Sequence, residues 1–151
     1  MRGALGNAPV AFIRNASTIP VIPFDRNEHA RLRQEISPDR PIVCFFGFAN
    51  PNKGVERLFA IADPASHHLL LLCDLDAANP YHASLLRLSR ETPWAGHVTV
   101  TGFLPAQRVA AHLAIADAFI FPFPNGTGEW NTSVQAAAAT GALVLATTPD
   151  P

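Results

Sequence analysis

Short apolar runs alternate with amphipathic segments along most of the chain. This alternation is typical of βα units and predicts a mostly parallel sheet. Strands are expected near residues 9–13, 41–47, 68–73, 97–101, 118–122 and 142–146. Those near 41, 68, 118 and 142 are apolar almost throughout, as in parallel strands that helices cover on both faces. The predicted fold class is therefore α/β, with helices on both faces of the sheet.

Helix start and stop signals fall between these strands. Asp25 and Glu28 have the spacing of a capping box. Asn79 stands before a proline that can open a helix, and Gly141 can close an alanine-rich one. Helices are expected near residues 25–36, 53–62, 79–88, 105–115 and 132–141.

The two ends of the chain differ from this alternating middle. Residues 14–24 hold two prolines and little periodicity, which predicts a linker. Residues 1–38 are accordingly expected to be the tail of a missing N-terminal domain plus this linker. Residues 39–151 are expected to form the compact domain, truncated at its C-terminus because no covering helix follows the last apolar strand.

Composition narrows the class of protein. The 151 residues are 48% hydrophobic and 15% charged, which fits one globular domain. The 11 basic and 12 acidic residues form no long run of either sign, so no nucleic-acid footprint is visible. Cys44 and Cys73 lie in apolar runs and are expected as buried, unpaired thiols of a reducing, cytoplasmic compartment. No apolar stretch approaches the length needed to span a bilayer.

The loop at 47–54 is a candidate ligand loop, because ligands of open parallel sheets bind beyond the carboxyl ends of the strands. Gly47 allows a close backbone approach, and Lys53 is expected in the first turn of a helix. A cation there works against the helix dipole unless it holds an anion such as a diphosphate. A solvated surface lysine is the alternative.

The loop at 122–132 is long, polar and glycine-bearing, and it leads into a helix near Thr132. Gln135 follows Thr132 at the spacing of a capping box. It would also face the crevice at the strand ends, where a ligand hydroxyl could bond to it. For Glu129 and Trp130, ordinary solvation and edge packing are the alternatives to a role in a site.

Four blocks resemble, in order and spacing, the C-terminal domain of group 1 (family 4) glycosyltransferases. They are residues 45–54 (FFGFANPNKG), 99–104 (TVTGFL), 114–122 (AIADAFIFP) and 133–146 (SVQAAAATGALVLA). The resemblance covers about residues 10–148. It implies a Rossmann-like half of a GT-B fold that pairs with an N-terminal acceptor-binding domain. It also implies transfer of a sugar from a nucleotide diphosphate donor, with retention and without a metal or other cofactor.

The resemblance assigns roles by position. Lys53 would hold the donor phosphates, and Gly47 would give them room. Thr132 and Ser133 would present backbone N–H groups to the diphosphate, and Gln135 would contact the ribose in place of a conserved glutamate. The loop along the base would consist of Gly102, Phe103 and Leu104.

The chain departs from the family pattern at positions that contact the donor in other members. The family commonly has two glutamates seven residues apart, but Gln135 replaces the second, Thr127 stands at the first, and Glu129 is displaced by two. Phe48 stands where many members have an arginine that works with the lysine. If the loop is reorganised so that Glu129 reaches the sugar, Glu129 and Gln135 are the candidate catalytic residues. Otherwise the branch is divergent or inactive, and a divergent enzyme is favoured.

Two other functions remain open. Asp74 and Asp76 spell the Asp-x-Asp triplet with which metal-dependent GT-A glycosyltransferases hold a cation. A nucleotide-binding or interaction module without catalysis would also fit the departures. The six histidines show no metal-ligand spacing and are expected on the surface. The isolated chain is expected not to transfer sugar, and membrane contact is expected only through the missing half.

Overall fold

The computed structural model describes residues 11, 15–23, 25–128 and 130–148. Its centre is a five-stranded sheet in which every pairing is parallel and the strand order is β3-β2-β1-β4-β5. The strands are β1 Ile42–Phe46, β2 His68–Leu72, β3 Val98–Val100, β4 Ala118–Phe121 and β5 Leu143–Ala146. Each coincides with a predicted strand. The strand predicted near 9–13 lies almost entirely outside the described residues, and residue 11 is in no strand.

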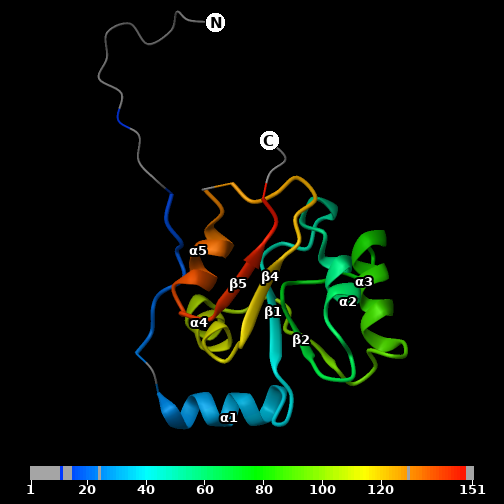
Figure 1. Ribbon diagram of the computed structural model, residues 1–151, viewed down its shortest axis with the longest axis horizontal. Helices are drawn as coiled ribbons and strands as arrows, with labels where there is room; N and C mark the ends of the chain where they lie inside the picture. The colour runs from blue at the N-terminus through cyan, green and yellow to red at the C-terminus, as the bar shows by residue number, and fades with distance from the viewer. Residues whose placement is uncertain (1–10, 12–14, 24, 129, 149–151) are drawn as a thin grey trace, which may run out of the picture.

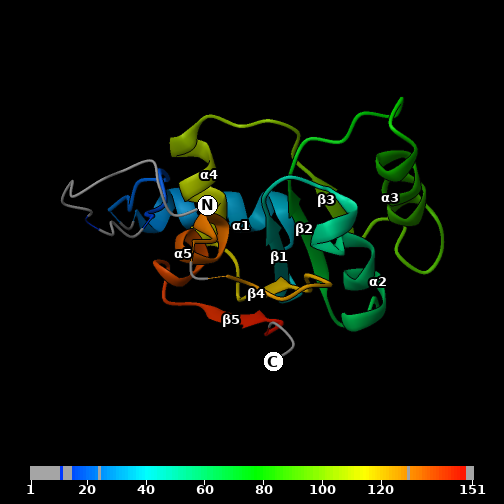
Figure 2. The same ribbon diagram turned by 90° about the horizontal axis from the view of Figure 1, so that it is seen from above.

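Helices cover the sheet from both sides, which confirms the predicted fold class. They are α1 Arg26–Ile36, α2 Leu58–Ile61, α3 Pro80–Arg90, α4 Ala106–Ala114 and α5 Thr132–Ala138. Figures 1 and 2 show α4 and α5 on one side of the strands and α2 and α3 on the other. The strand order runs outward from β1 to β3 and then returns to β4 beside β1. The winding direction therefore reverses between β1 and β4.

Side-chain caps start three of the helices. Asp25 and Asn79 accept hydrogen bonds from first-turn backbone N–H groups of α1 and α3, as the sequence predicts. Asn131 caps α5 by accepting from the third N–H of that helix at 3.2 Å. The predicted capping box between Thr132 and Gln135 is therefore wrong, because Thr132 is already the first helical residue.

The single helix predicted over 53–62 is also wrong. Two short 3₁₀ turns, Pro51–Lys53 and Val55–Arg57, precede the one-turn helix α2. Gly54 separates the turns with a φ of +59°, in the left-handed region. This break places Lys53 at the end of a 3₁₀ turn, so the helix-dipole argument does not apply to it.

Burial of the strands follows their position in the sheet. The central strands β1, β2 and β4 are buried along nearly their whole length. The expectation that β5 is covered on both faces is wrong: Leu143 and Leu145 are 60% and 48% exposed. An edge strand has one neighbour only, and α5 is the helix that packs on β5.

Helix α1 packs on the sheet domain although it precedes residue 39. Leu32 is 1% exposed and belongs to the same apolar core as the strands. Arg33 donates to the Asp117 carboxylate at 2.6 Å, and that carboxylate also accepts from the backbone N–H of Ile42 at 2.6 Å. The start of β1 and the start of β4 are thus tied to α1.

Both cysteines are buried and free, as predicted. Burial raises the pKa of the Cys73 thiol to about 12, and the neighbouring Asp74 carboxylate adds to this effect. Burial likewise raises the pKa of Cys44. Both thiols are therefore protonated at neutral pH.

His68 and His112 contradict the expectation of surface histidines, since they are 6% and 5% exposed. His68 lies in β2, and its Nε2 shares a hydrogen bond of 2.8 Å with the Thr99 hydroxyl on β3. Burial, followed by the charges of His97 and Arg40, lowers the pKa of His68 to about 4. The imidazole is neutral in the folded chain at neutral pH.

A His68→Gln variant should lose less stability in acid than the wild-type chain. The folded pKa of about 4 lies below the usual value of 6.5, so unfolding takes up a proton between these limits. His68 contributes nothing to the pH dependence above that window. By pH 4 protonation of His68 in the unfolded chain should lower the free energy of unfolding by about 3 kcal/mol. Urea unfolding of both proteins at pH 7, 5.5 and 4.5 measures it, and parallel pH profiles would contradict this assignment.

Candidate nucleotide-sugar site

The carboxyl ends of β1 and β4 meet at the point where the winding direction reverses. Ligands of open α/β sheets bind at such points. A cavity of about 750 Å³ opens there between the loops that follow the two strands. From this point the cavity extends over the loops that follow β2 and β3.

Most of the sequence-predicted site residues meet in this cavity. Seven of the eight predicted binding residues line it: Gly47, Lys53, Gly102, Phe103, Leu104, Thr132 and Ser133. Gln135, the eighth, is half-buried one turn further into α5 and is not among the lining residues. Glu129 lies outside the described residues.

Lys53 is the chain's only lysine, and it links the loops after β1 and β4. Its Nζ lies 4.1 Å from the centroid of the Phe123 ring, a cation–π contact. Among the described residues no carboxylate forms an ion pair with it. The positive charge is therefore not neutralised by the part of the chain that the structure describes.

Two glycines let the loops approach each other closely. Gly47 follows β1 with a φ of +142°, and a Cβ there would lie 2.9 Å from the Ser133 Oγ at the start of α5. A Cβ on Gly54 would overlap the Pro122 carbonyl oxygen after β4. A side chain at Gly54 would push the two walls of the cavity apart, whereas one at Gly47 would displace the Ser133 hydroxyl.

The start of α5 supplies backbone donors to the same cavity. Thr132 and Ser133 are its first two residues, and Asn131 ahead of them holds the helix end in place through its side chain. Among the described residues, no hydrogen bond uses the backbone N–H groups of Thr132 and Ser133. The first N–H groups of a helix have no partner within it.

The far end of the cavity carries an acid and an aromatic ring. Asp74 follows β2, and its Oδ1 lies 3.9 Å from where a Cβ of Gly102 would stand. Phe103, next to Gly102, is 87% exposed. Phe48 and Trp130 also line the cavity and are 83% and 72% exposed.

Asp74 lines the cavity although it is not among the predicted site residues. The sequence places its loop at a strand end, where ligands bind, but the Asp-x-Asp triplet is interpreted there only as a metal motif or a solvated loop. In the described residues no group of three His, Cys, Asp or Glu side chains could hold a metal ion.

Thr127, where the resemblance expects a glutamate, has a structural contact instead of a place in the cavity. Its backbone N–H and its hydroxyl donate to the Thr147 carbonyl oxygen at 2.9 and 3.0 Å. It does not line the cavity. The position instead ties the loop after β4 to the end of β5.

Comparison with curated proteins finds relatives among sugar-transferring enzymes. A GDP-mannose-dependent alpha-mannosyltransferase of Mycolicibacterium smegmatis is 36% identical over 129 residues, which are 83% of this chain and 30% of the relative. A GDP-mannose-dependent alpha-(1-6)-phosphatidylinositol monomannoside mannosyltransferase of the same organism is 30% identical over 100 residues. These cover 65% of this chain and 26% of that relative. No protein-family model matches the chain.

Solved structures share the fold. Anabaena HepE in complex with UDP and glucose superposes with a TM-score of 0.67 at 18% identity, over 80% of this chain and 33% of that one. Sucrose-phosphate synthase from Thermosynechococcus elongatus has a TM-score of 0.62 at 24% identity, over 76% and 29%. The chain is similar in sequence to these mannosyltransferases and has the Rossmann-like fold of one half of a GT-B glycosyltransferase.

This GT-B assignment decides between two of the earlier interpretations. The alternative of a GT-A enzyme that binds a metal through Asp74 and Asp76 is wrong, because the strand order and the structural relatives are those of a GT-B half. The GT-B chain spans 30% of the length of the first curated relative. No helix in its described part is both long and apolar enough to cross a membrane.

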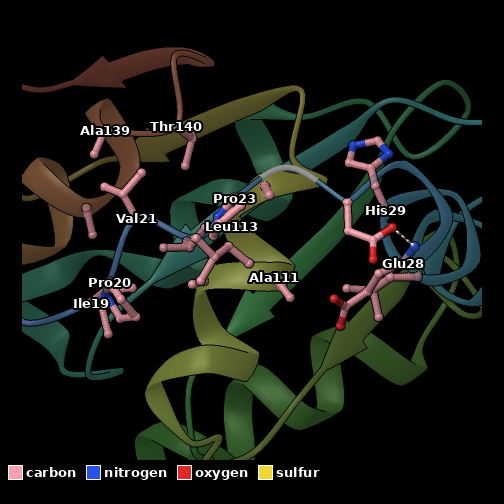
Figure 3. A pocket seen from close by; sticks show the side chains of 16 residues that line it. Ile19, Pro20, Val21, Pro23, Glu28, His29, Ala111, Leu113, Ala139 and Thr140 are labelled. Atoms are coloured by element: carbon pink, nitrogen blue, oxygen red, sulfur yellow. Dashed lines mark hydrogen bonds between the residues drawn. The ribbon is translucent and has the colours of Figure 1, made fainter.

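A second hollow, of about 300 Å³, lies away from the strand ends. Segment 19–23 covers it, between α1, α4 and α5. Figure 3 shows Ile19 and Val21 at one end and Glu28 and His29 at the other. Most of its lining is apolar, and none of the predicted site residues takes part in it.

Proposed function

We propose that the chain forms the donor site of a glycosyltransferase that transfers a hexose from a nucleoside diphosphate sugar to an acceptor. One observation carries the proposal. An unneutralised lysine, a glycine without room for a side chain and the start of α5 surround one cavity at the switch point of the sheet. The GT-B-like fold and the sequence similarity to mannosyltransferases support it.

The residues around the switch point suit a diphosphate. The Lys53 ammonium can make charge-assisted hydrogen bonds to phosphate oxygens. Gly47 leaves the backbone open to close approach, and the N–H groups of Thr132 and Ser133 can donate to the same oxygens. As the bond between the sugar and the diphosphate breaks, negative charge grows on the leaving group, and these donors stabilise it. This chemistry uses no metal.

The sugar end of the site is proposed from the family resemblance. Gln135 is proposed to contact the ribose or sugar hydroxyls. Glu129, which lies outside the described residues, is proposed to reach the transferred sugar. We propose transfer with retention of the anomeric configuration. The runner-up is a module that binds the nucleotide without catalysing transfer, which the replacement of glutamate by Gln135 favours.

The nucleotide is proposed to be GDP. Both curated relatives are named for GDP-mannose, whereas HepE is bound to UDP. Over the aligned residues the two relatives are 36% and 30% identical to this chain, and HepE is 18% identical. We therefore favour GDP-mannose as the donor.

The whole protein is proposed to hold the acceptor in a second domain. Residues 39–151, together with helix α1 that packs on them, would be the donor-binding unit, and the residues before α1 would lead to an N-terminal acceptor domain. Transfer needs donor and acceptor to be held together in reactive geometry. The whole protein is proposed to be cytoplasmic. Any contact with a membrane is proposed to be made by the other domain.

The chain should bind GDP with the same affinity in EDTA and in Mg²⁺, because its own cation and N–H donors meet the diphosphate. Calorimetric titration with GDP, UDP and ADP in each buffer measures this. Guanosine serves as the control ligand without phosphates. Failure of all three diphosphates to bind would overturn the proposed function, and binding in Mg²⁺ only would overturn its metal independence.

A further inference from the structure

We propose that Asp74 selects guanine at the donor site by accepting two hydrogen bonds from the base. This inference rests on the proposed function and concerns the end of the cavity opposite Lys53. It assigns a specificity role to a residue whose carboxylate has no partner in the described part of the chain.

The direction of the nucleotide follows from the shape of the cavity. The residues proposed to bind the diphosphate lie in the loops after β1 and β4. From there the cavity extends over the loops after β2 and β3. Thr147 and Thr148, the two described residues after β5, do not line it. Two strand spacings, roughly 10 Å, separate β1 from β3. A nucleoside joined to the diphosphate must therefore lie toward Asp74 and Phe103.

The Asp74 side chain is exposed, so a ligand in the cavity would take water from its carboxylate. Asp74 lines a cavity proposed to bind a diphosphate, and its negative charge repels such a ligand. Lys53, the only lysine or arginine among the described residues that line the cavity, lies at the other end. The repulsion is offset if the ligand turns hydrogen-bond donors toward Asp74.

Guanine alone among the common bases presents two adjacent donors. Its N1–H and N2–H₂ groups stand side by side, and a carboxylate, which only accepts, can bind both. Uracil presents one N–H between two carbonyl oxygens, and adenine presents an amino group beside a ring nitrogen that accepts. A carboxylate facing either of these bases meets a lone pair.

The surroundings of Asp74 fit a flat ring. Gly102 has no side chain, and its φ of +69° is one that L-residues with side chains rarely adopt. Phe103 offers an exposed aromatic face beside it. Base stacking on aromatic side chains does not depend on base identity, so the choice of base is left to the carboxylate.

The test compares four diphosphates on three proteins by calorimetry. The ligands are GDP, inosine diphosphate, xanthosine diphosphate and UDP. The proteins are the wild-type chain, Asp74→Asn and the control Asp76→Asn. Asp76 belongs to the same loop but does not line the cavity, and an asparagine there can still accept from the Ala78 N–H.

Wild type should bind GDP roughly tenfold more tightly than inosine diphosphate, which lacks the N2 amino group. Asp74→Asn should weaken the binding of GDP roughly 10- to 100-fold. It should strengthen the binding of xanthosine diphosphate, because the amide can donate to the xanthine O2 and accept from N1–H. Asp76→Asn should follow wild type with every ligand.

Three results would count against the inference, and they are distinguishable. An Asp74→Asn variant that keeps the wild-type order of affinities, or that weakens all four ligands equally, overturns the guanine role while leaving a nucleotide site. If Asp76→Asn changed the affinities as much as Asp74→Asn does, the effect would come from the loop as a whole and not from a contact with the base. Failure of wild type to bind any diphosphate overturns the proposed function and this inference with it.

Discussion

The Lys53→Ala variant should bind GDP roughly 10- to 100-fold more weakly than the wild-type chain. The substitution removes the only lysine, whose ammonium lies in the cavity over the Phe123 ring without a described carboxylate partner. Hydrogen bonds to a charged group are among the stronger ones, so their loss should dominate the affinity. Calorimetry with GDP measures the effect.

The control for this variant is Arg57→Ala. Arg57 lies four residues later in the same segment, is exposed, and does not line the cavity. It should bind GDP as wild type does. Guanosine affinity should be the same in all three proteins, because it has no phosphate. Equal loss of guanosine and GDP binding in Lys53→Ala would mean that the lysine acts on the fold of the loop and not on the diphosphate.

The Gly54→Ala variant should be destabilised by about 2–5 kcal/mol. Gly54 has a φ of +59°, and a Cβ would overlap the Pro122 carbonyl oxygen. Because the obstacle is backbone, the loops after β1 and β4 would have to separate. Urea unfolding monitored by circular dichroism gives the change in free energy.

Gly141→Ala separates the two causes of this effect. Gly141 has a φ of +80°, but a Cβ there would meet nothing within 4 Å. It should lose only the left-handed cost of about 1–2 kcal/mol. Equal destabilisation of the two variants would show that the contact between the loops contributes nothing to stability.

The order of strands and helices could be predicted because each buried parallel strand is an apolar run between polar loops. Whether a strand lies at the centre or at the edge of the sheet could not be predicted in the same way. The run at β5 is as apolar as those at β1 and β2, yet an edge position leaves Leu143 and Leu145 exposed. Likewise, His68 looks polar in sequence but lies buried in β2, where Thr99 on the next strand bonds to it.

The segment at 53–62 shows the limit of helical periodicity. Its apolar side chains do face the core, since Val55 and Leu58 are fully buried. Short 3₁₀ turns produce a similar spacing, however, and Gly54 separates them with its left-handed φ. The close approach of Gly54 to Pro122 joins residues far apart in sequence. Only the folded chain reveals that contact.

The candidate site could be predicted as a set of loops more readily than as a set of roles. The resemblance selected seven residues that line one cavity. It could not explain Thr127, whose two donors hold the loop to the end of β5. Asp74 was interpreted from the Asp-x-Asp triplet alone, and a triplet in sequence does not show which neighbours its carboxylate has.

The most direct test of the account is a crystal structure of the chain with GDP. The account predicts the diphosphate at the ends of β1 and β4, with a phosphate oxygen within about 4 Å of the Lys53 Nζ. It predicts the guanine beside Phe103 with its N1–H and N2–H₂ on the Asp74 carboxylate. GDP bound in the hollow under segment 19–23, or reversed so that the base meets Lys53, would contradict it.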